Sequence, residues 1–188
     1  GGGSQSPLGG SEGISERELG KTVARLIKDE SVKAVVLRID SPGGSALASD
    51  LLWKKLMKLR SEKPLVISVG GMAASGGYYL ACAGTKIVAE STSIVGSIGV
   101  VSGKLAVGKA LHEFGITTQI VAAAPDPQKA ARASYMSPFA GWDDATREKV
   151  LHSMTSVYDL FVKRIAEGRG VDVKKVGESA EGRIFSGT

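Results

Sequence analysis

One serine lies where nucleophilic chemistry could take place. Ser75 stands between an apolar run at residues 65–69 and a short apolar segment at residues 78–83, and its close neighbours are Ala and Gly. A sharp strand-to-helix turn needs such small neighbours. The hydroxyl would be exposed above a helix N-terminus, whose unpaired N–H groups favour the negative charge of a tetrahedral acyl intermediate. The segment indicates a nucleophile, although a serine that only caps a helix fits the same residues.

A second turn, Asp-Ser-Pro-Gly-Gly at residues 40–44, ends the preceding apolar run. If both runs are parallel strands of one sheet, both turns lie at the same edge of it. Gly43 and Gly44 have no side chain to block close approach, so their backbone N–H groups could reach an oxyanion. Removing one such donor typically costs about 3–4 kcal/mol of transition-state stabilisation. Taken alone, these residues also fit an ordinary Pro-Gly turn before a helix capped by Ser45.

A serine hydroxyl needs a proton acceptor within hydrogen-bond reach. The chain has two histidines, His112 and His152, and none between residues 76 and 111. Both fall in expected helices, and we interpret them as surface or packing residues. Lysine can act as the base if burial keeps its amine neutral. The residues therefore favour lysine over histidine as the partner of Ser75.

The elements that must position these turns alternate along the chain. Apolar runs predict strands at residues 34–39, 65–69, 86–89 and 118–122. Helical spacing predicts helices at residues 15–27, 45–59, 78–83, 104–114 and 143–167, the first with a capping box of Ser15 and Glu18. The helix at residues 45–59 is expected to be amphipathic, with an apolar face of Leu47, Leu51, Leu52, Leu56 and Leu59. Residues 91–99 and 123–138 are expected loops. This alternation predicts an α/β fold, a sheet layered against helices.

Composition agrees with one domain of this class. The 188 residues are 43% hydrophobic and 23% charged, and the net charge of +5 is scattered rather than clustered, so we expect no nucleic-acid partner. No apolar run reaches the roughly 18 residues of a membrane span. The lone Cys82 is expected to be a buried small hydrophobe. Nothing in the sequence indicates a cofactor or a metal ion.

Three segments in register resemble the bacterial signal peptide peptidase (protease IV) family: residues 35–44, 71–79 and 96–99. The resemblance implies a ClpP/crotonase-like spiral of β-β-α units over residues 14–188, after a flexible segment at residues 1–13. It implies that Ser75 is the acylated nucleophile and that backbone N–H groups near Gly44 and Gly76 bind the oxyanion. It also implies that Ser97 orients the catalytic lysine.

The sequence departs from the family pattern at that lysine. The family position, counted back from Pro138, falls on Ala133, and the neighbouring Arg132 cannot deprotonate. Lys129 is the nearby alternative, but it is expected to be solvated. Long members of the family carry two repeats, of which the first supplies the lysine and the second the serine. We therefore interpret this chain as such a C-terminal repeat, cut at both ends, whose general base lies outside it.

The resemblance implies peptide substrates, signal peptides above all, and a homo-oligomer or pairing with an N-terminal repeat. It also implies a bacterial, membrane-associated protein with its catalytic domain on the extracytoplasmic (periplasmic) side, attached through a segment outside this chain. Two alternatives stay open. A non-catalytic assembly domain could share the fold, as could an acyl-CoA hydratase or isomerase, although no carboxylate lies between residues 70 and 86.

Overall fold

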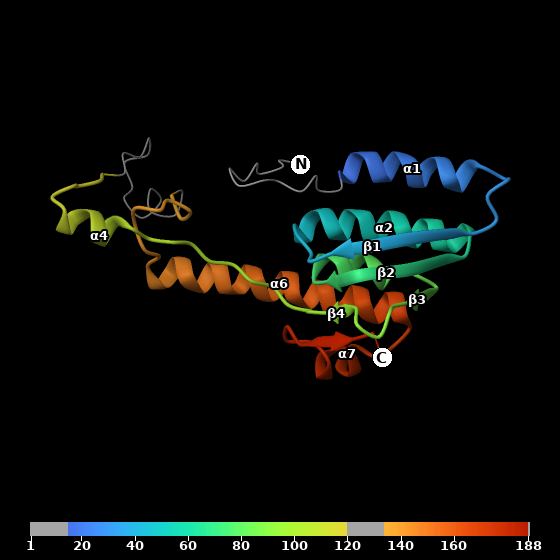
Figure 1. The fold of residues 1–188 in the computed structure, drawn as a ribbon. Helices are drawn as coiled ribbons and strands as arrows, with labels where there is room; N and C mark the ends of the chain where they lie inside the picture. Colours follow the sequence, from blue (N-terminus) through green and yellow to red (C-terminus); the bar gives the residue numbers. More distant parts are fainter. Residues whose placement is uncertain (1–14, 120–133, 188) are drawn as a thin grey trace. The chain divides into compact units, whose positions relative to one another are not determined.

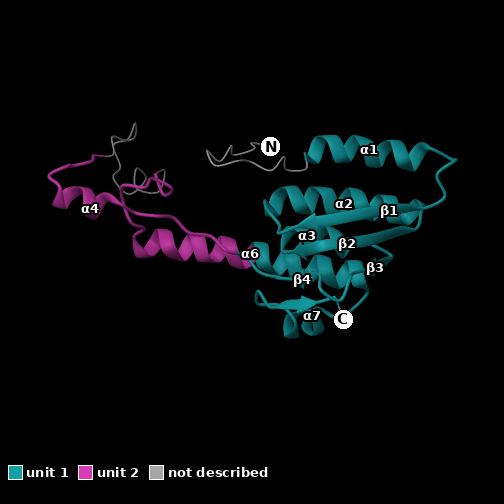
Figure 2. Cartoon of the chain, in the orientation of Figure 1, with its two compact units in different colours: residues 1–100, 157–188 teal, residues 101–156 magenta. Residues whose placement is uncertain are grey.

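The computed structural model describes residues 15–119 and 134–187. The chain divides into two compact units, Gly1–Val100 with Val157–Thr188 (unit 1) and Val101–Ser156 (unit 2), which Figure 2 shows in different colours. The flexible segment predicted at residues 1–13 lies outside the described residues, as do Lys129 and Ala133.

A five-stranded sheet forms the frame of unit 1 (Figure 1). It consists of β1 (Val35–Ser41), β2 (Leu65–Ala74), β3 (Lys86–Val88), β4 (Ile94–Gly96) and β5 (Ile184–Ser186). The central strand β2 is parallel to β1, to β3 along its first half and to β4 along its second half, and β5 is antiparallel to β4. The predicted α/β class is confirmed.

Helices separate these strands in the sequence. Unit 1 contains α1 (Glu16–Lys28), α2 (Ala46–Glu62), α3 (Gly76–Ala81) and α7 (Val173–Glu178), while α4 (Gly108–Glu113) belongs to unit 2 and α6 (Asp144–Arg169) extends through both. Ser45 caps α2 as predicted, since its side chain accepts a hydrogen bond from Ala48 N at 3.4 Å. Ser15 is the N-cap residue of α1, but its side chain makes no capping bond, so the predicted capping box is wrong there.

The core lies between α2, β2, α3 and the second half of α6. Leu52, Trp53, Leu56 and Leu59 form the buried apolar stripe of α2, at the spacing of one helix face. Leu65 and Ile67 of β2 are 0% exposed and belong to the same cluster, as do Phe161 and Ile165 of α6. Leu47 and Leu51, which the sequence placed on the apolar face, are 70% and 39% exposed. They lie toward the opposite side of α2, because at about 3.6 residues per turn both are about 140–180° around the helix from Leu56.

Four elements differ from the sequence predictions. Strand β2 continues through Gly70 and Gly71 to Ala74, and the expected loop at residues 91–99 contains β4, because residues 72–74 and 94–96 pair with each other. The helix expected at residues 104–114 is shorter. Of the strand expected at residues 118–122, residues 118–119 form no strand and the others lie outside the described residues. The longer β2 and the new strand β4 arise from tertiary pairing, which local composition does not encode.

Three other expectations concern single side chains. Cys82 is 0% exposed, and burial raises the pKa of its thiol to about 12, as expected for a packing residue. His112 and His152 are both exposed.

Among the helices of residues 15–119 and 134–187, none is long and apolar enough to cross a membrane.

Candidate active site

The two small-residue turns meet at one edge of the sheet. Because β1 and β2 are parallel, the turn after Ser41 and the turn at Ser75 follow the same ends of neighbouring strands. A Cβ added to Gly43 would lie 2.8 Å from Ser75 Cβ and 2.9 Å from Gly76 N. Only glycine fits at position 43. The Pro-Gly turn is thus packed backbone-to-backbone against the serine turn.

Ser75 adopts a strained backbone conformation. Its φ is 50° and its ψ is −118°. Among the described residues only Ser75, Ser97 and Glu181 have positive φ without being glycine. Such conformations cost about 1–3 kcal/mol and persist where the surroundings hold them. Here Ser75 N donates to Gly96 O and Ser75 O accepts from Tyr79 N, both at 2.9 Å. The half-buried side chain makes no capping bond, so the helix-cap alternative does not describe it.

Two backbone amides converge beside Ser75. Helix α3 begins at Gly76, whose N–H therefore has no partner within the helix. A Cβ on Gly76 would lie 3.1 Å from Gly44 N, so the Gly44 amide lies against the start of α3. The Gly43 amide already donates to Ser41 Oγ at 3.2 Å. The geometry therefore makes Gly44 and Gly76 the better donors, with Gly43 providing the close approach.

Ser97 occupies the matching position on the next strand. Gly96 of β4 pairs with Ala74 of β2, so Ser97 and Ser75 follow directly after paired residues. Ser97 also has positive φ, at 51°, and its N–H donates to Arg183 O at 2.7 Å. The C-terminal strand β5 is antiparallel to β4 and holds this turn from the other side. The structure thus brings both predicted serines to one place.

The lysines described in unit 1 do not supply an evident base. Lys86 pairs with Val66, nine residues before Ser75 along β2, which at about 3.3 Å per residue is about 30 Å away. Lys54 and Lys55 form ion pairs with Asp50 and Glu16. Lys63, at the C-terminal end of α2, donates to the carbonyls of Leu26 and Asp29 at the C-terminal end of α1. Within the described residues, no contact of a lysine amine with Ser75 or Ser97 is recorded.

The sequence interpretation missed polar residues of α2 beside the site. A Cβ on Gly76 would lie 2.7 Å from Ser49 Oγ, which shows that α2 touches the start of α3. Ser49 and Asp50 are each 7% exposed. The sequence pattern could have indicated that Ser49 faces the core, because Ser49 precedes the buried Leu52 and Leu56 by three and seven residues and so lies on the same helix face.

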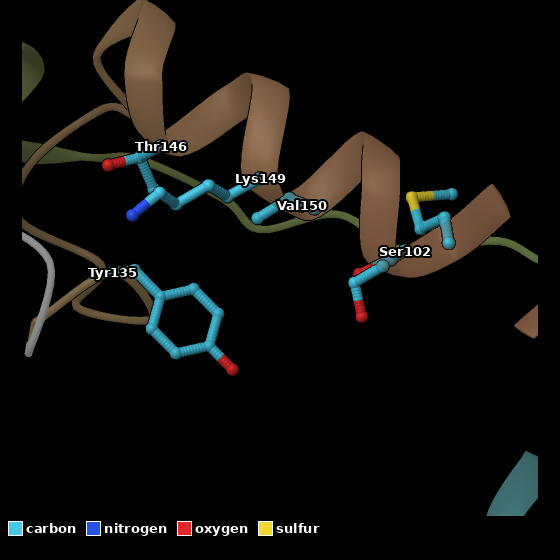
Figure 3. Close-up of a pocket in the computed structure, with 7 residues that line it drawn as sticks. Ser102, Tyr135, Thr146, Lys149 and Val150 are labelled. Atoms are coloured by element: carbon cyan, nitrogen blue, oxygen red, sulfur yellow. The ribbon is translucent and has the colours of Figure 1, made fainter. Parts of the chain in front are cut away.

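A separate cavity lies within unit 2 (Figure 3). It has a volume of about 380 Å³, and Figure 3 shows Tyr135 and Lys149 at its wall. The lining residues are Ser102, Tyr135, Thr146, Lys149, Val150, Ser153 and Met154. None of the predicted site residues belongs to this cavity.

Two family models match this chain. Peptidase family S49 matches residues 57–188, which include Ser75 and Ser97. Clp protease matches residues 14–95, which include both turns.

Curated relatives resemble nearly the whole chain. "Serine protease SPPA, chloroplastic" of Arabidopsis thaliana is 34% identical over 182 residues, 95% of this chain and 25% of the relative. "Protease 4" of Haemophilus influenzae is 33% identical over 183 residues, 94% and 28% respectively. "Protease 4" of Salmonella typhi is 32% identical over 173 residues, 89% and 27%. The chain therefore spans about a quarter of the length of these relatives.

The close approach of the two turns can be tested by adding one methyl group. In the complete protein that contains this chain, Gly43→Ala would force the new alanine into a φ of 115° and its methyl group against Ser75. We expect at least about a tenfold loss in hydrolysis of a peptide ester, because misplacing a reacting group by about 1 Å is that costly. Gly71→Ala is the matched control, since the nearest atom to its Cβ would be Asp40 Oδ1 at 3.6 Å. Equal activity of the two variants would contradict the arrangement.

Proposed function

This chain belongs to peptidase family S49, and we propose that it is the serine-bearing part of an endopeptidase with a Ser–Lys dyad. The predicted kinship with signal peptide peptidase and protease IV is confirmed by the family match and the protease 4 relatives. The predicted ClpP/crotonase-like fold is also confirmed. The observation that carries the proposal is the strained turn at Ser75, packed against Gly43 and beside two backbone amides.

In the proposed mechanism Ser75 Oγ attacks the carbonyl carbon of the scissile peptide bond while its proton passes to a neutral lysine amine. The N–H groups of Gly44 and Gly76 bind the oxyanion that forms. Collapse of this intermediate breaks the C–N bond, and the lysine returns the proton to the leaving amine. Water then attacks the acyl-enzyme by the same route, which releases the acid and restores Ser75.

Ser97 is proposed to orient the lysine. Its position beside Ser75 across the β2–β4 pair supports this role, as does its positive φ, since strained residues cluster at functional sites. A hydrogen bond from or to the Ser97 hydroxyl would hold the amine toward Ser75 Oγ. The lysine itself is proposed to come from a preceding repeat or another subunit, because Ala133 occupies the family position.

We propose apolar peptides, including remnant signal peptides, as substrates. Exposed Leu47 and Leu51 support this, because they follow the Gly43–Gly44 turn in the first two turns of α2 and offer exposed apolar surface there. A membrane-associated bacterial protein with an extracytoplasmic (periplasmic) catalytic domain, attached through a segment outside this chain, fits such substrates. Accessibility of the complete protein to protease in spheroplasts tests this location, and protection would contradict it.

An oligomer, or pairing with an N-terminal repeat, is proposed from the surface of unit 2. None of the core residues recorded for the described ranges lies in unit 2. Val101, Leu105 and Phe114 are 99%, 78% and 82% exposed. Apolar side chains exposed in such number mark interaction sites in soluble proteins. Sedimentation equilibrium of the complete protein checks this, and a monomer with a single repeat would contradict it.

The nucleophile is tested by removing its hydroxyl. Ser75→Ala in the complete protein should abolish hydrolysis of an apolar peptide ester and leave the thermal unfolding midpoint unchanged or slightly higher. The stability should hold because the side chain makes no capping bond. Turnover and thermal unfolding are measured on the same sample. Turnover retained by a folded Ser75→Ala protein would remove Ser75 from the mechanism.

Ser97→Ala should lower turnover less than Ser75→Ala does. The reason is that Ser97 orients the base rather than attacking the substrate, and general-base contributions typically amount to roughly 10²–10⁴-fold in total. Without its hydrogen-bond partner, the lysine should titrate at a different pH, which shifts the limbs of the pH–rate curve. A wild-type rate with a wild-type pH profile would make Ser97 a plain turn residue.

The source of the lysine is tested with the isolated chain. Alone, it should fold and hydrolyse peptides poorly, since an unactivated serine is a weak nucleophile even beside an oxyanion hole. Activity should appear when the preceding repeat is added. Lys129→Ala should leave that activity unchanged. Robust activity of the chain alone, lost in Lys129→Ala, would instead assign the base to Lys129.

A further inference from the structure

A buried carboxylate that the proposed mechanism does not use lies beneath the serine turn. Asp50 of α2 is 7% exposed. Its Oδ1 accepts hydrogen bonds from Tyr79 OH at 3.0 Å and Arg164 Nε at 2.9 Å, and its Oδ2 pairs with Lys54 Nζ at 2.7 Å. Burial acts to raise the pKa of Asp50, but the hydrogen bonds from Lys54, Arg164 and Tyr79 outweigh it, and the pKa lies below its usual value. The carboxylate is therefore charged at neutral pH.

Tyr79 connects this carboxylate to the nucleophile. Its backbone N–H donates to Ser75 O at 2.9 Å, one helical turn away. The residue before Asp50, Ser49, lies against Gly76, as the 2.7 Å approach of its Oγ to a Cβ added there shows. Ser49 Oγ itself donates to Ser45 O at 3.0 Å. Two successive residues of α2 thus contact α3, one at its first residue and one a turn later.

Helix α6 contacts both α2 and α3. Arg164, which donates to Asp50, lies with its guanidinium carbon 4.6 Å from the centre of the Trp53 ring. The ring of Tyr79 stacks on Phe161, with centroids 4.5 Å apart and 15° between the planes. Helix α3 has only six residues, too few to be stable without such contacts. Its orientation is therefore set by α2 and α6.

The hydrogen bonds to the Asp50 carboxylate constrain α3 in a way that apolar packing does not. Packing alone lets a short helix rotate or slide, because apolar contacts are non-directional. Hydrogen bonds to a charged group are directional and among the strongest available. A buried ion pair is weak evidence for stability, since hydrophobic replacements of similar volume are often as stable. The buried charge of Asp50 is therefore better explained by a role in fixing one orientation of α3.

We propose that Asp50 is a positioning residue, which through Tyr79 fixes the orientation of α3 and thereby the placement of Ser75 Oγ and the Gly76 amide. This inference rests on the proposed function. It concerns the rate of the chemical step rather than substrate affinity, because Asp50 and Tyr79 OH are buried and bind no part of the peptide.

The test compares variants of the complete protein by kcat, KM and thermal unfolding. Asp50→Asn removes the buried charge that faces Arg164, leaves that guanidinium only Glu167 as an acidic partner, and could prevent folding. Tyr79→Phe is therefore the deciding variant, since it keeps the ring on Phe161 and removes only the hydroxyl. We expect kcat to fall roughly tenfold with KM unchanged, as for a displaced catalytic group. Leu59→Val is the control, a core change near the C-terminal end of α2 that leaves Asp50 and Tyr79 intact, and should lower the unfolding midpoint while keeping kcat.

The outcomes separate this inference from the proposed function. A Tyr79→Phe protein with wild-type kcat, or with a change in KM alone, overturns the positioning role. The positioning role is also overturned if Leu59→Val, at an equal loss of stability, lowers kcat as much as Tyr79→Phe does. If Ser75→Ala is inactive in the same assay, the proposed function stands in each of these cases. Activity that persists in Ser75→Ala would instead remove the proposed function itself.

Discussion

The contact between two backbones at the edge of the sheet is the constraint on which the site depends. Gly43 lies so close to Ser75 and Gly76 that a single methyl group would occupy the space of their atoms. This approach is possible because β1 and β2 are parallel and end together, and because small residues follow both strands. It brings the Gly44 amide against the start of α3. The Ser75 turn and the Gly44 and Gly76 amides are thereby assembled by backbone contacts.

The surrounding structure maintains that contact against strain. Ser75 and Ser97 both have positive φ, and each turn is held by a hydrogen bond from its own N–H, to Gly96 O and Arg183 O respectively. The strand β4 thus supports the Ser75 turn, and the residues before β5 support the turn that follows β4. Beneath the site, Asp50 and Arg164 anchor Tyr79. Strain in the backbone of Ser75 is balanced by contacts between segments that lie far apart in the sequence.

Much of this arrangement could be predicted from the sequence, and the rest depends on tertiary structure. Apolar runs and small-residue turns predicted β1, the first half of β2, and the position of Ser75 between a strand and a helix. They did not predict β4, because three residues in a small-residue loop become a strand only by pairing with residues 72–74. The contact between Asp50 and Arg164 was missed because these residues are 114 positions apart in sequence. Leu47 and Leu51 were expected among the apolar residues of the helix's buried face, but at about 3.6 residues per turn they project away from Leu56 and are exposed.

The central claim is that Ser75 is the residue that becomes acylated. The most direct measurement is to treat the complete protein with a fluorophosphonate probe and map the modified residue by peptide mass spectrometry. The account predicts one adduct, on the peptide that contains Ser75, absent from Ser75→Ala and formed faster than on any other serine. An adduct on a different serine, or labelling that persists in a folded Ser75→Ala protein, would contradict it.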